Sequence, residues 1–293
     1  MAIGGGSSID CAKVIAAGAV YEGDAWDLVM DNEKVHGALP IYVVLTMAAT
    51  GSEMDNVGVI SDMDLQIKKG LHSDHIFPTM SILDPTYTYT LPKRQTAAGT
   101  ADIMSHTFEN YFTNVEGAYL QKRFAEGLLK TLIHYGPIAI QDPTNYDARA
   151  NLMWCSSNAI NGLLKKGAEV KWCVHGMEHQ LSAVYDVTHG EGLAILTPVW
   201  MEYILDQKVD AFATYGINVW NIDAKKDKRT IAKEAIEKTK HFLFDELGCP
   251  RTLREVGITD EKNFQAMAEK AACEGSFVDL STDDVIEIYR RAL

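Results

Sequence analysis

The chain has 293 residues, of which 47% are hydrophobic and 23% are charged, and its formal net charge is −13. That much apolar sequence can form one large core or two medium ones, so we expect two unequal domains and little disorder. The negative charge repels phosphate backbones and anionic lipid, which argues against nucleic acid and membrane surfaces as partners. No apolar run approaches the roughly 20 residues of a membrane helix. We therefore expect a cytoplasmic protein.

Five cysteines are spread along the chain, and no two of them form a CxxC pair. An odd number at wide spacing indicates neither a disulfide framework nor a zinc site built on thiolates. We expect buried or unreactive thiols. They are Cys11, Cys155, Cys173, Cys249 and Cys273.

In the first 92 residues, short β-type runs alternate with loops and one amphipathic helix. The predicted strands cover residues 40–45, 57–60 and 80–83, and the predicted helix covers residues 11–19. Only Met1, Ala2 and Ile3 precede the glycine-rich segment GGGSSID, whereas a turn of this kind normally follows a strand of about four residues or more. The sequence therefore reads as if it began within a sheet.

Beyond Pro92 the β signal fades, and long segments with helical periodicity follow. They cover residues 119–134, 146–164 and 230–247. The segment from Asp84 to Pro92 contains two prolines and marks the predicted domain boundary. We expect an α/β domain at residues 1–92 and an all-helical domain at residues 93–293.

Asp102 and His106 lie four residues apart in GTADIMSHTFENYF, whose apolar spacing predicts a helix. Side chains at this spacing leave the same face of a helix, as the ligands of a metal often do. The alternative is a solvated pair of side chains, because a carboxylate and an imidazole often occur at this spacing. Taken alone, the pair does not decide between these interpretations.

Three of the nine histidines fall within VHGMEHQLSAVYDVTHGEG: His175, His179 and His189. His175 and His179 share a helix face. Thr188 and Glu191 have the spacing of a capping box, so a second helix is predicted to begin there with His189 in its first turn. Burial of three imidazoles is costly without a cation or a hydrogen-bond partner for each, so the cluster favours a metal site.

Together the two clusters offer one carboxylate and three imidazoles as metal ligands, namely Asp102, His106, His175 and His189. This set suits Fe²⁺ or Zn²⁺ and is unlike a calcium site. His179, one turn from His175, is then a neighbour of the metal and not a ligand. A neutral histidine in that place is predicted to act as a proton shuttle.

Two segments of the α/β part are candidates for ligand binding. GGGSSID precedes the predicted helix, whose N–H groups and positive end can bind a phosphate, although a triple glycine turn also occurs as a plain connection. The segment LTMAATGSE at residues 45–53 offers Thr46, Thr50 and Ser52 as donors, and the alternative is an ordinary strand-to-helix loop.

Five segments stand in the order and spacing of the iron-containing alcohol dehydrogenases: GGGSSID, TMAATGSEMD, ILDPTYTYTLP, TADIMSHTFENYF and HGMEHQLSAVYDVTHG. The chain resembles this family from residue 3 to 293, and most of all its branch of butanol dehydrogenases and broad-specificity aldehyde reductases. The resemblance implies a partial Rossmann-like dinucleotide-binding domain at residues 1–92 and a metal-binding domain at residues 93–293. We also expect a homodimer.

The resemblance implies that Fe²⁺ or Zn²⁺ is held by Asp102, His106, His175 and His189. It implies that His179 lies beside the substrate and that Lys68 lies close to the nicotinamide ribose, so both are candidate catalytic residues. Contacts with NAD or NADP are implied for Gly5, Gly6, Ser7, Asp10, Thr46 and Thr50. Asp55 stands where the nearest relatives have a neutral asparagine, so that contact is not carried over.

Family members have a further α/β half-domain before the point where this chain begins, including a first glycine-rich loop near the adenosine end of the cofactor. The residues that choose between NAD and NADP lie largely in that part, and the branch resembled usually favours NADP. We therefore expect the truncated chain to keep its metal site and to bind the nicotinamide cofactor poorly.

The implied activity is the transfer of hydride between NAD(P)H and a small aldehyde or primary alcohol, with the metal as a Lewis acid on the substrate oxygen. Two alternatives stay open. The chain could be a folded metal-binding fragment with little or no turnover. It could also be a metal-dependent hydrolase, because HGMEH fits the reversed HxxEH pattern with Glu178 as the base.

Overall fold

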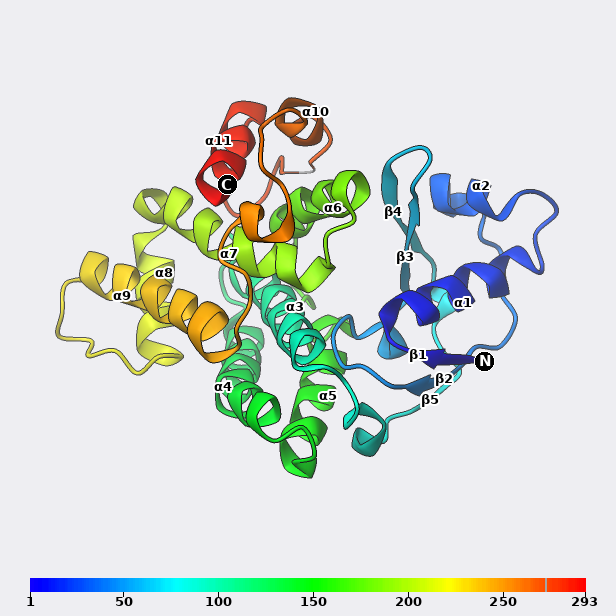
Figure 1. The fold of residues 1–293 in the computed structure, drawn as a ribbon, viewed down its shortest axis with the longest axis horizontal. Coiled ribbons are helices and arrows are strands. Elements are labelled where there is room, and N and C mark those ends of the chain that lie inside the picture. Colours follow the sequence, from blue (N-terminus) through cyan, green and yellow to red (C-terminus); the bar gives the residue numbers. More distant parts are fainter. Residues whose placement is uncertain (272) are drawn as a thin grey trace.

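The computed structural model describes residues 1–271 and 273–293, and it consists of a small sheet region beside a larger helical region (Figure 1). The strands are β1 (Ala2–Gly4), β2 (Tyr42–Leu45), β3 (Val57–Asp62), β4 (Ile67–His72) and β5 (Met80–Ile82). The α-helices are α1 (Gly6–Gly18), α2 (Ala25–Met30), α3 (Lys93–Tyr111), α4 (Tyr119–Gln141), α5 (Tyr146–Ile160), α6 (Cys173–Tyr185), α7 (His189–Ile204), α8 (Val209–Asn218), α9 (Lys228–His241), α10 (Phe264–Ala268) and α11 (Thr282–Ala292). Shorter helical turns are η1 (Asn32–Lys34), η2 (Ser52–Met54), η3 (Asp74–Ile76), η4 (Pro85–Thr88), η5 (Leu205–Gln207), η6 (Phe242–Glu246, π-helical) and η7 (Leu253–Val256).

The predicted fold class is confirmed, because α/β structure precedes α3 and the described residues after it contain helices and no strand. The three predicted strands are present as β2, β3 and β5. Helix α1 begins five residues earlier than predicted, directly within the glycine-rich segment. Strand β4 was not predicted, and the helix predicted to reach residue 247 continues from α9 into the π-helical turn η6.

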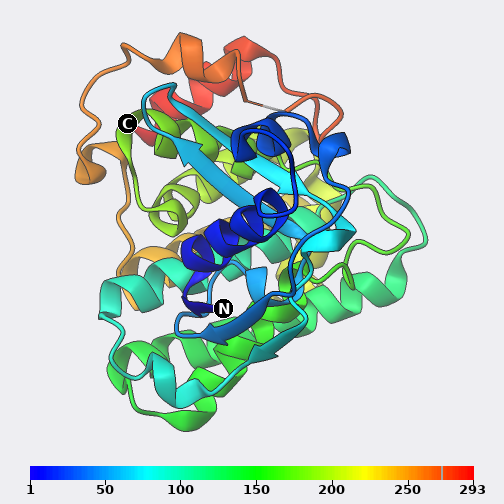
Figure 2. The ribbon, with the colours of Figure 1, turned by 90° about the vertical axis from the view of Figure 1, so that its right-hand side faces the viewer.

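The sheet at the start of the chain is parallel, with the strand order β1-β2-β5. Its alternating residues separate into two faces. Ala2, Val43 and Leu45 are buried against Ile9 and Ala16 of α1, which lies across the sheet in Figure 2. The opposite face exposes four large apolar side chains, those of Ile3, Tyr42, Met80 and Ile82. One face of the sheet therefore has an apolar surface outside the core.

An antiparallel hairpin of β3 and β4 packs beside this sheet and is joined to α1 by a buried ion pair. Lys13 of α1 is fully buried, and its Nζ donates to Asp55 Oδ1 at 2.5 Å and to the carbonyl oxygen of Val57 at 2.6 Å. The carboxylate of Asp55 also accepts from the N–H of Val57. Asp55, whose role was left open by the sequence, thus holds the hairpin against the helix.

Helix α3 is the centre of the helical region (Figure 1). All of its residues from Thr96 to Tyr111 are buried, because α4, α5, α6 and α7 pack around it. One large apolar cluster runs from Ala97 to Ala292, whereas a smaller cluster joins the sheet, α1 and Met153 of α5. Two separate cores support the domain division that we propose at residues 92 and 93.

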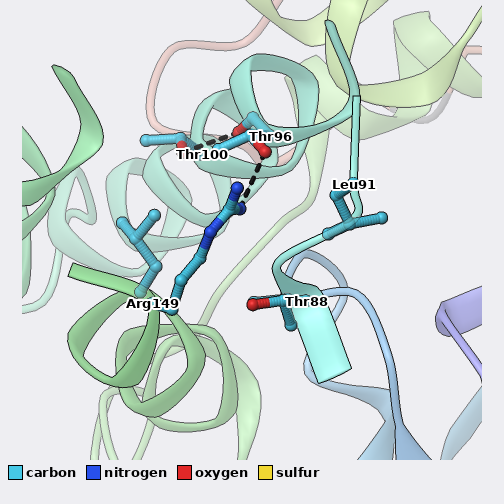
Figure 3. Close-up of a pocket in the computed structure, with 7 residues that line it drawn as sticks. Thr88, Leu91, Thr96, Thr100 and Arg149 are labelled. Carbon is cyan, nitrogen blue, oxygen red and sulfur yellow. Dashed lines mark hydrogen bonds between the residues drawn. The ribbon is translucent and has the colours of Figure 1, made fainter. Parts of the chain in front are cut away.

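A buried arginine lies beside the boundary segment and bonds to the start of α3. Arg149 of α5 donates through Nη1 to Thr96 Oγ1 at 2.8 Å and through Nε to the carbonyl oxygen of Pro143 at 2.8 Å (Figure 3). Thr88 of η4 and Leu91 line the small cavity beside it. These contacts fix the start of α3, on which the site described below depends.

Within the described residues, no helix combines the length and apolar character needed to cross a membrane.

We predict that Lys13→Met lowers the free energy of unfolding by about 3–5 kcal/mol, because it leaves the Asp55 carboxylate buried without its cation. Chemical denaturation of the purified chain measures the change. The matched control is Lys228→Met, which removes an ion pair with Asp210 at the surface and should change stability little. Equal losses in the two variants would contradict the structural importance that we give to the Lys13–Asp55 pair.

Candidate metal centre and cofactor loop

Two of the predicted metal ligands lie in the middle of α3. Asp102 is 3% exposed and His106 is 6% exposed, and four residues place them on the same side of the helix. Burial opposes ionisation of Asp102, but the histidines that face it hold the pKa of its carboxyl below the usual range. Burial lowers the pKa of His106 to about 4, which favours the neutral imidazole that a metal requires.

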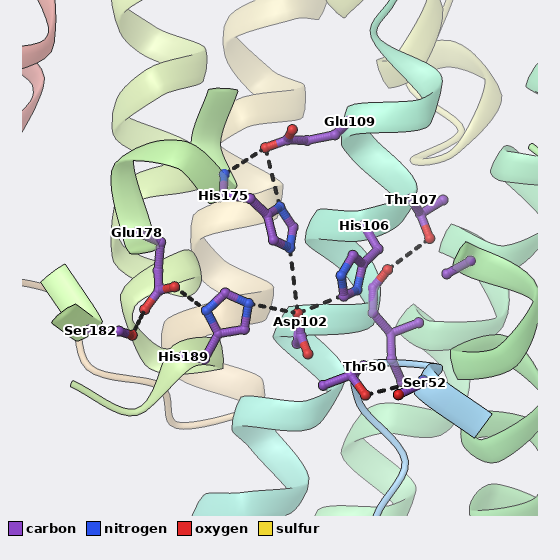
Figure 4. A network of polar contacts seen from close by, with 12 residues as sticks. Thr50, Ser52, Asp102, His106, Thr107, Glu109, His175, Glu178, Ser182 and His189 are labelled. Carbon is purple, nitrogen blue, oxygen red and sulfur yellow. Dashed lines mark hydrogen bonds and ion pairs between the residues drawn. The ribbon is translucent and has the colours of Figure 1, made fainter. Parts of the chain in front are cut away.

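Helices α6 and α7 bring two further imidazoles to the same point (Figure 4). Asp102 Oδ1 lies 3.3 Å from His106 Nδ1, 3.8 Å from His175 Nε2 and 3.7 Å from His189 Nε2. The His106 and His175 rings are stacked with their centres 4.5 Å apart. The structure therefore turns all three predicted imidazoles toward Asp102, although only Asp102, His175 and His189 form a group whose ligand atoms all lie within 4.8 Å of one another.

Several polar atoms at this point have no hydrogen-bond partner among the described residues. They are Asp102 Oδ1, His106 Nδ1 and His175 Nε2, and all of them are buried. Buried polar atoms in folded proteins are normally paired, so three unpaired atoms that face one another need an explanation. A divalent cation between them would supply it. The ligand atoms of Asp102, His175 and His189 all lie within 4.8 Å of one another, close enough to hold one ion.

Two buried carboxylates contact the Nδ1 atoms of His175 and His189, on the sides of the rings that face away from Asp102. Glu109 Oε1 accepts from the backbone N–H of His175 at 2.9 Å and lies 3.3 Å from His175 Nδ1. Glu178 Oε2 contacts His189 Nδ1. Carboxylates in this position orient a histidine so that its other nitrogen can bind a metal. Sequence reasoning did not find this role for either residue, although the spacing of Glu109, seven residues after Asp102, is a usable signal.

The burial of these rings shifts their pKa values in different directions. Burial lowers the pKa of His189 well below its usual value. For His175, burial also acts to lower the pKa, but the nearby carboxylates of Asp102 and Glu109 raise it to about 9. A metal that binds Nε2 of His175 would therefore have to displace a proton from this ring.

The start of α7 was predicted correctly, but the predicted capping box is wrong. Thr188 is the N-cap residue, yet its side chain makes no capping hydrogen bond. The Glu191 carboxylate instead accepts from Arg94 Nε at 2.5 Å and from Arg94 Nη2 at 2.7 Å. The two N–H groups of an arginine bind a carboxylate more strongly than one backbone N–H does. Glu191 therefore pairs with Arg94 of α3 and does not cap α7.

His179 is half-buried beside the four residues and does not face Asp102. Its ring centre lies 5.4 Å from that of His189 and 6.2 Å from that of His175. Burial and the nearby Lys68 ammonium lower its pKa well below the usual value. A second, overlapping group of possible ligands consists of Glu178, His179 and His189. His189 belongs to both groups because its two nitrogens point in opposite directions.

Lys68 of β4 reaches this site from the other part of the molecule. Its Nζ lies 3.4 Å from Glu178 Oε2 and 3.3 Å from His189 Nδ1. The hairpin thus places a cation at the edge of the histidine cluster, and the lysine is separated from Glu178 by 110 positions in the sequence.

The glycine-rich loop and the segment after β2 lie against each other. Gly5 is the N-cap of α1, and Gly6 opens the helix. A Cβ at Gly6 would lie 2.4 Å from Oγ1 and Cγ2 of Thr50, so only glycine fits there. The N–H of Thr46 donates to the carbonyl oxygen of Gly4 at 3.0 Å, and Ser7 is exposed. Five of the six residues that we proposed for the cofactor therefore surround the N-terminal end of α1.

Asp10, the sixth residue, has its carboxylate turned into the protein. Its Oδ1 accepts from Ser52 Oγ at 2.6 Å, and its Oδ2 accepts from the N–H of Val59 at 3.0 Å. Burial raises its pKa to about 6. Both oxygens are occupied, so the role that we propose for Asp10 changes from direct cofactor contact to positioning of the loop.

Comparison with known families covers nearly the whole chain. The family described as "Fe-containing alcohol dehydrogenase family, C-terminal" matches residues 96–293, and the one described as "Iron-containing alcohol dehydrogenase" matches residues 1–85. The chain belongs to the iron-containing alcohol dehydrogenase family. The resemblance seen in the sequence is thereby confirmed. The prediction of a nicotinamide-dependent oxidoreductase with a metal is confirmed with it.

Individual members of this family agree in sequence and in structure. NADH-dependent butanol dehydrogenase A from Clostridium acetobutylicum is 56% identical over 100% of this chain and 76% of its own length. The NADPH-dependent aldehyde reductase YqhD from Escherichia coli is 41% identical over 99% of this chain and 76% of its length. NADH-dependent butanol dehydrogenase A from Thermotoga maritima has a solved structure that superposes with a TM-score of 0.92 at 35% identity, over 99% of this chain and 75% of that one.

We predict that Gly190→Ala weakens metal binding and lowers the melting temperature. A Cβ at residue 190 would lie 2.0 Å from the carbonyl oxygen of Ala98, so α7 must move away from α3 and take His189 with it. Metal titration and thermal denaturation measure the two effects. Gly127→Ala in α4 is the control, because a Cβ there meets open space and should stabilise the helix by roughly 0.5–1 kcal/mol. Unchanged metal affinity in Gly190→Ala would contradict the prediction.

Proposed function

We propose that this member of the iron-containing alcohol dehydrogenase family binds one divalent metal, Fe²⁺ or Zn²⁺, through Asp102, His106, His175 and His189. Its reaction is the interconversion of a small aldehyde and the corresponding primary alcohol with a nicotinamide cofactor. The observation that supports this most strongly is the set of imidazoles turned toward Asp102 Oδ1, with buried atoms that lack other partners among the described residues. A carboxylate with three imidazoles is a donor set suited to these ions.

The overlapping group of Glu178, His179 and His189 is a weaker candidate for the metal. The oxygens of Glu178 are already in contact with Ser182, Lys68 and His189. A divalent cation there would also lie against the Lys68 ammonium, which repels it. Among the described residues, no lysine or arginine contacts the Asp102 carboxylate, and the atoms that face one another there are unpaired.

The residues around the proposed centre have separate tasks in the reaction. A bound metal would supply a Lewis acid for the substrate oxygen, and the nicotinamide would supply or accept hydride. Asp102 and the three histidines would hold the ion in a largely buried place. His179 lies beside them as a neutral imidazole, suited to move a proton to or from the substrate oxygen.

The cofactor is proposed to lie between the N-terminal end of α1 and the hairpin. The backbone N–H groups of Gly6 and Ser7 belong to the first turn of α1 and form part of the positive end of the helix dipole, where a pyrophosphate binds well. We propose NADH rather than NADPH as the preferred cofactor. Two relatives from Clostridium acetobutylicum, at 56% and 54% identity, are named NADH-dependent butanol dehydrogenases, although the resembled branch was expected to favour NADP.

The hydrolase alternative is not favoured by the geometry. Its base would be Glu178, but that carboxylate is 0% exposed and is already in contact with His189, Lys68 and Ser182. A general base must reach the water that it activates. The reversed HxxEH pattern in the sequence therefore coincides with a residue that faces other side chains and not the open site.

The alternative of a metal-binding fragment without turnover differs in one measurement. Such a fragment would bind metal and would not oxidise NADH in the presence of an aldehyde. A fluorescence titration with NADH, followed by an assay with butanal, separates the two functions.

A homodimer and a cytoplasmic location remain proposals, and the exposed apolar face of the sheet offers one surface for association.

We predict that His175→Ala and His189→Ala each lose most of the bound metal, because each variant removes one of four ligands. Elemental analysis of the purified variants measures the metal content. His241→Ala removes an exposed histidine of α9 that pairs with Asp245, and it should retain the metal. The same metal content in the wild type and in both ligand variants would exclude the proposed site.

We predict that His179→Ala retains its metal and turns over more slowly, because the residue is proposed to move a proton and not to bind the ion. The measurements are metal content and the rate of NADH oxidation with saturating aldehyde. A loss of metal as complete as in His175→Ala would show that His179 is a ligand, contrary to the proposal.

A further inference from the structure

Glu178 connects three groups that belong to different parts of the chain. It lies in α6 and is 0% exposed. Its Oε2 contacts His189 Nδ1 at the start of α7 and lies 3.4 Å from Lys68 Nζ of the hairpin. Its Oε1 accepts from Ser182 Oγ, one turn further along α6 (Figure 4). Each carboxylate oxygen is therefore used.

The hydrogen atoms in this cluster can be assigned by elementary chemistry. The ammonium of Lys68 has donors only, and an ionised carboxylate has acceptors only. Lys68 Nζ lies 3.3 Å from His189 Nδ1, but a ring nitrogen that donates to Glu178 cannot also accept from the lysine. Glu178 Oε2 is therefore the common acceptor of both donors. This fixes the His189 tautomer with its proton on Nδ1 and leaves Nε2 free toward Asp102.

The same carboxylate determines where Lys68 lies. The lysine side chain is 12% exposed, and in such a place an ammonium needs a partner of opposite charge. Without Glu178, Lys68 Nζ and the Nδ1 proton of His189 would face each other as two donors. The negative charge between them removes that conflict.

We infer that Glu178 is a positioning residue for two sites at once: it orients His189 toward the metal and holds Lys68 at the edge of the cofactor site. The inference rests on the proposed function, in which His189 binds the metal and Lys68 lies near the nicotinamide ribose. It differs from the role that HGMEH first suggested, because Glu178 acts through its neighbours and does not touch substrate.

Two substitutions at Glu178 separate its two tasks. Glu178→Ala removes both contacts, so we expect metal affinity to fall by about 10- to 100-fold and the Kd for NADH to rise. Glu178→Gln keeps a carbonyl oxygen that can accept from His189 Nδ1 but has no charge for Lys68. It should therefore keep most of the metal affinity while binding NADH as weakly as Lys68→Met does.

Metal affinity is measured by competition with a chelator, and the ligand geometry is followed in the visible spectrum of the Co²⁺-loaded protein. NADH binding is measured by fluorescence titration. The control is Glu126→Gln, which neutralises another buried carboxylate, bonded to Tyr111 and Asn218, and should change neither metal affinity nor NADH binding. Circular dichroism of each metal-free variant checks that it is folded.

Equal metal affinity in folded Glu178→Ala and the wild type overturns the inference, as does unchanged NADH binding in Glu178→Gln. If Glu178→Ala does not fold, the comparison of Glu178→Gln with Lys68→Met still decides the second task. The first task is then decided by Glu178→Asp, whose shorter side chain draws the carboxylate back from His189 Nδ1 and should change the Co²⁺ spectrum; an unchanged spectrum overturns it. A wild type that binds neither metal nor NADH instead rejects the proposed function. The two failures are therefore distinguishable.

Discussion

The carboxylate of Asp102 lies inside the central helix α3 with three imidazoles turned toward it, and a charge in such a place must be compensated. Two neighbouring helices meet this requirement. Helix α6 supplies His175 from its first turn, and α7 supplies His189 as its first residue. The dense packing of α3 against α4, α5, α6 and α7 then excludes the water that could otherwise solvate the carboxylate.

Polar groups further from Asp102 also lie next to groups of complementary charge. Asp102 faces imidazoles, the imidazoles face Glu109 and Glu178, and Glu178 faces Lys68. Each member is buried or nearly so, and therefore each one needs the next. Substitution of one member leaves its neighbours with a buried charge or an unpaired proton. The proposed metal centre in one part of the chain is therefore expected to depend on a lysine in a hairpin of the other part.

Patterns among neighbouring residues were sufficient to predict some elements of the fold and the site, but not the others. The strands β2, β3 and β5 carry apolar runs, and Asp102 with His106 has helical ligand spacing, so both could be predicted from nearby residues. Strand β4, IKKGLH, has no such apolar pattern, and it forms because it pairs with β3. The capping box failed for the same kind of reason, since Arg94 lies 97 positions from Glu191. The thiols of Cys173 and Cys273, 2.9 Å apart, were likewise beyond local inference.

The hairpin that sequence analysis only half predicted links the two sites physically. Its β3 strand is held to α1 by the Lys13 amine, which donates to Val57, and by Asp10, which accepts from Val59. Its β4 strand carries Lys68 to Glu178. The N-terminal end of α1, where a pyrophosphate is proposed to bind, and the outer nitrogen of His189 are therefore connected through one pair of strands. We expect a shift of α1 to move the hairpin with it, because the buried Lys13–Asp55 ion pair is costly to break. Such a shift would move Lys68 relative to Glu178, so the position of the cofactor loop and the orientation of His189 are expected to be coupled.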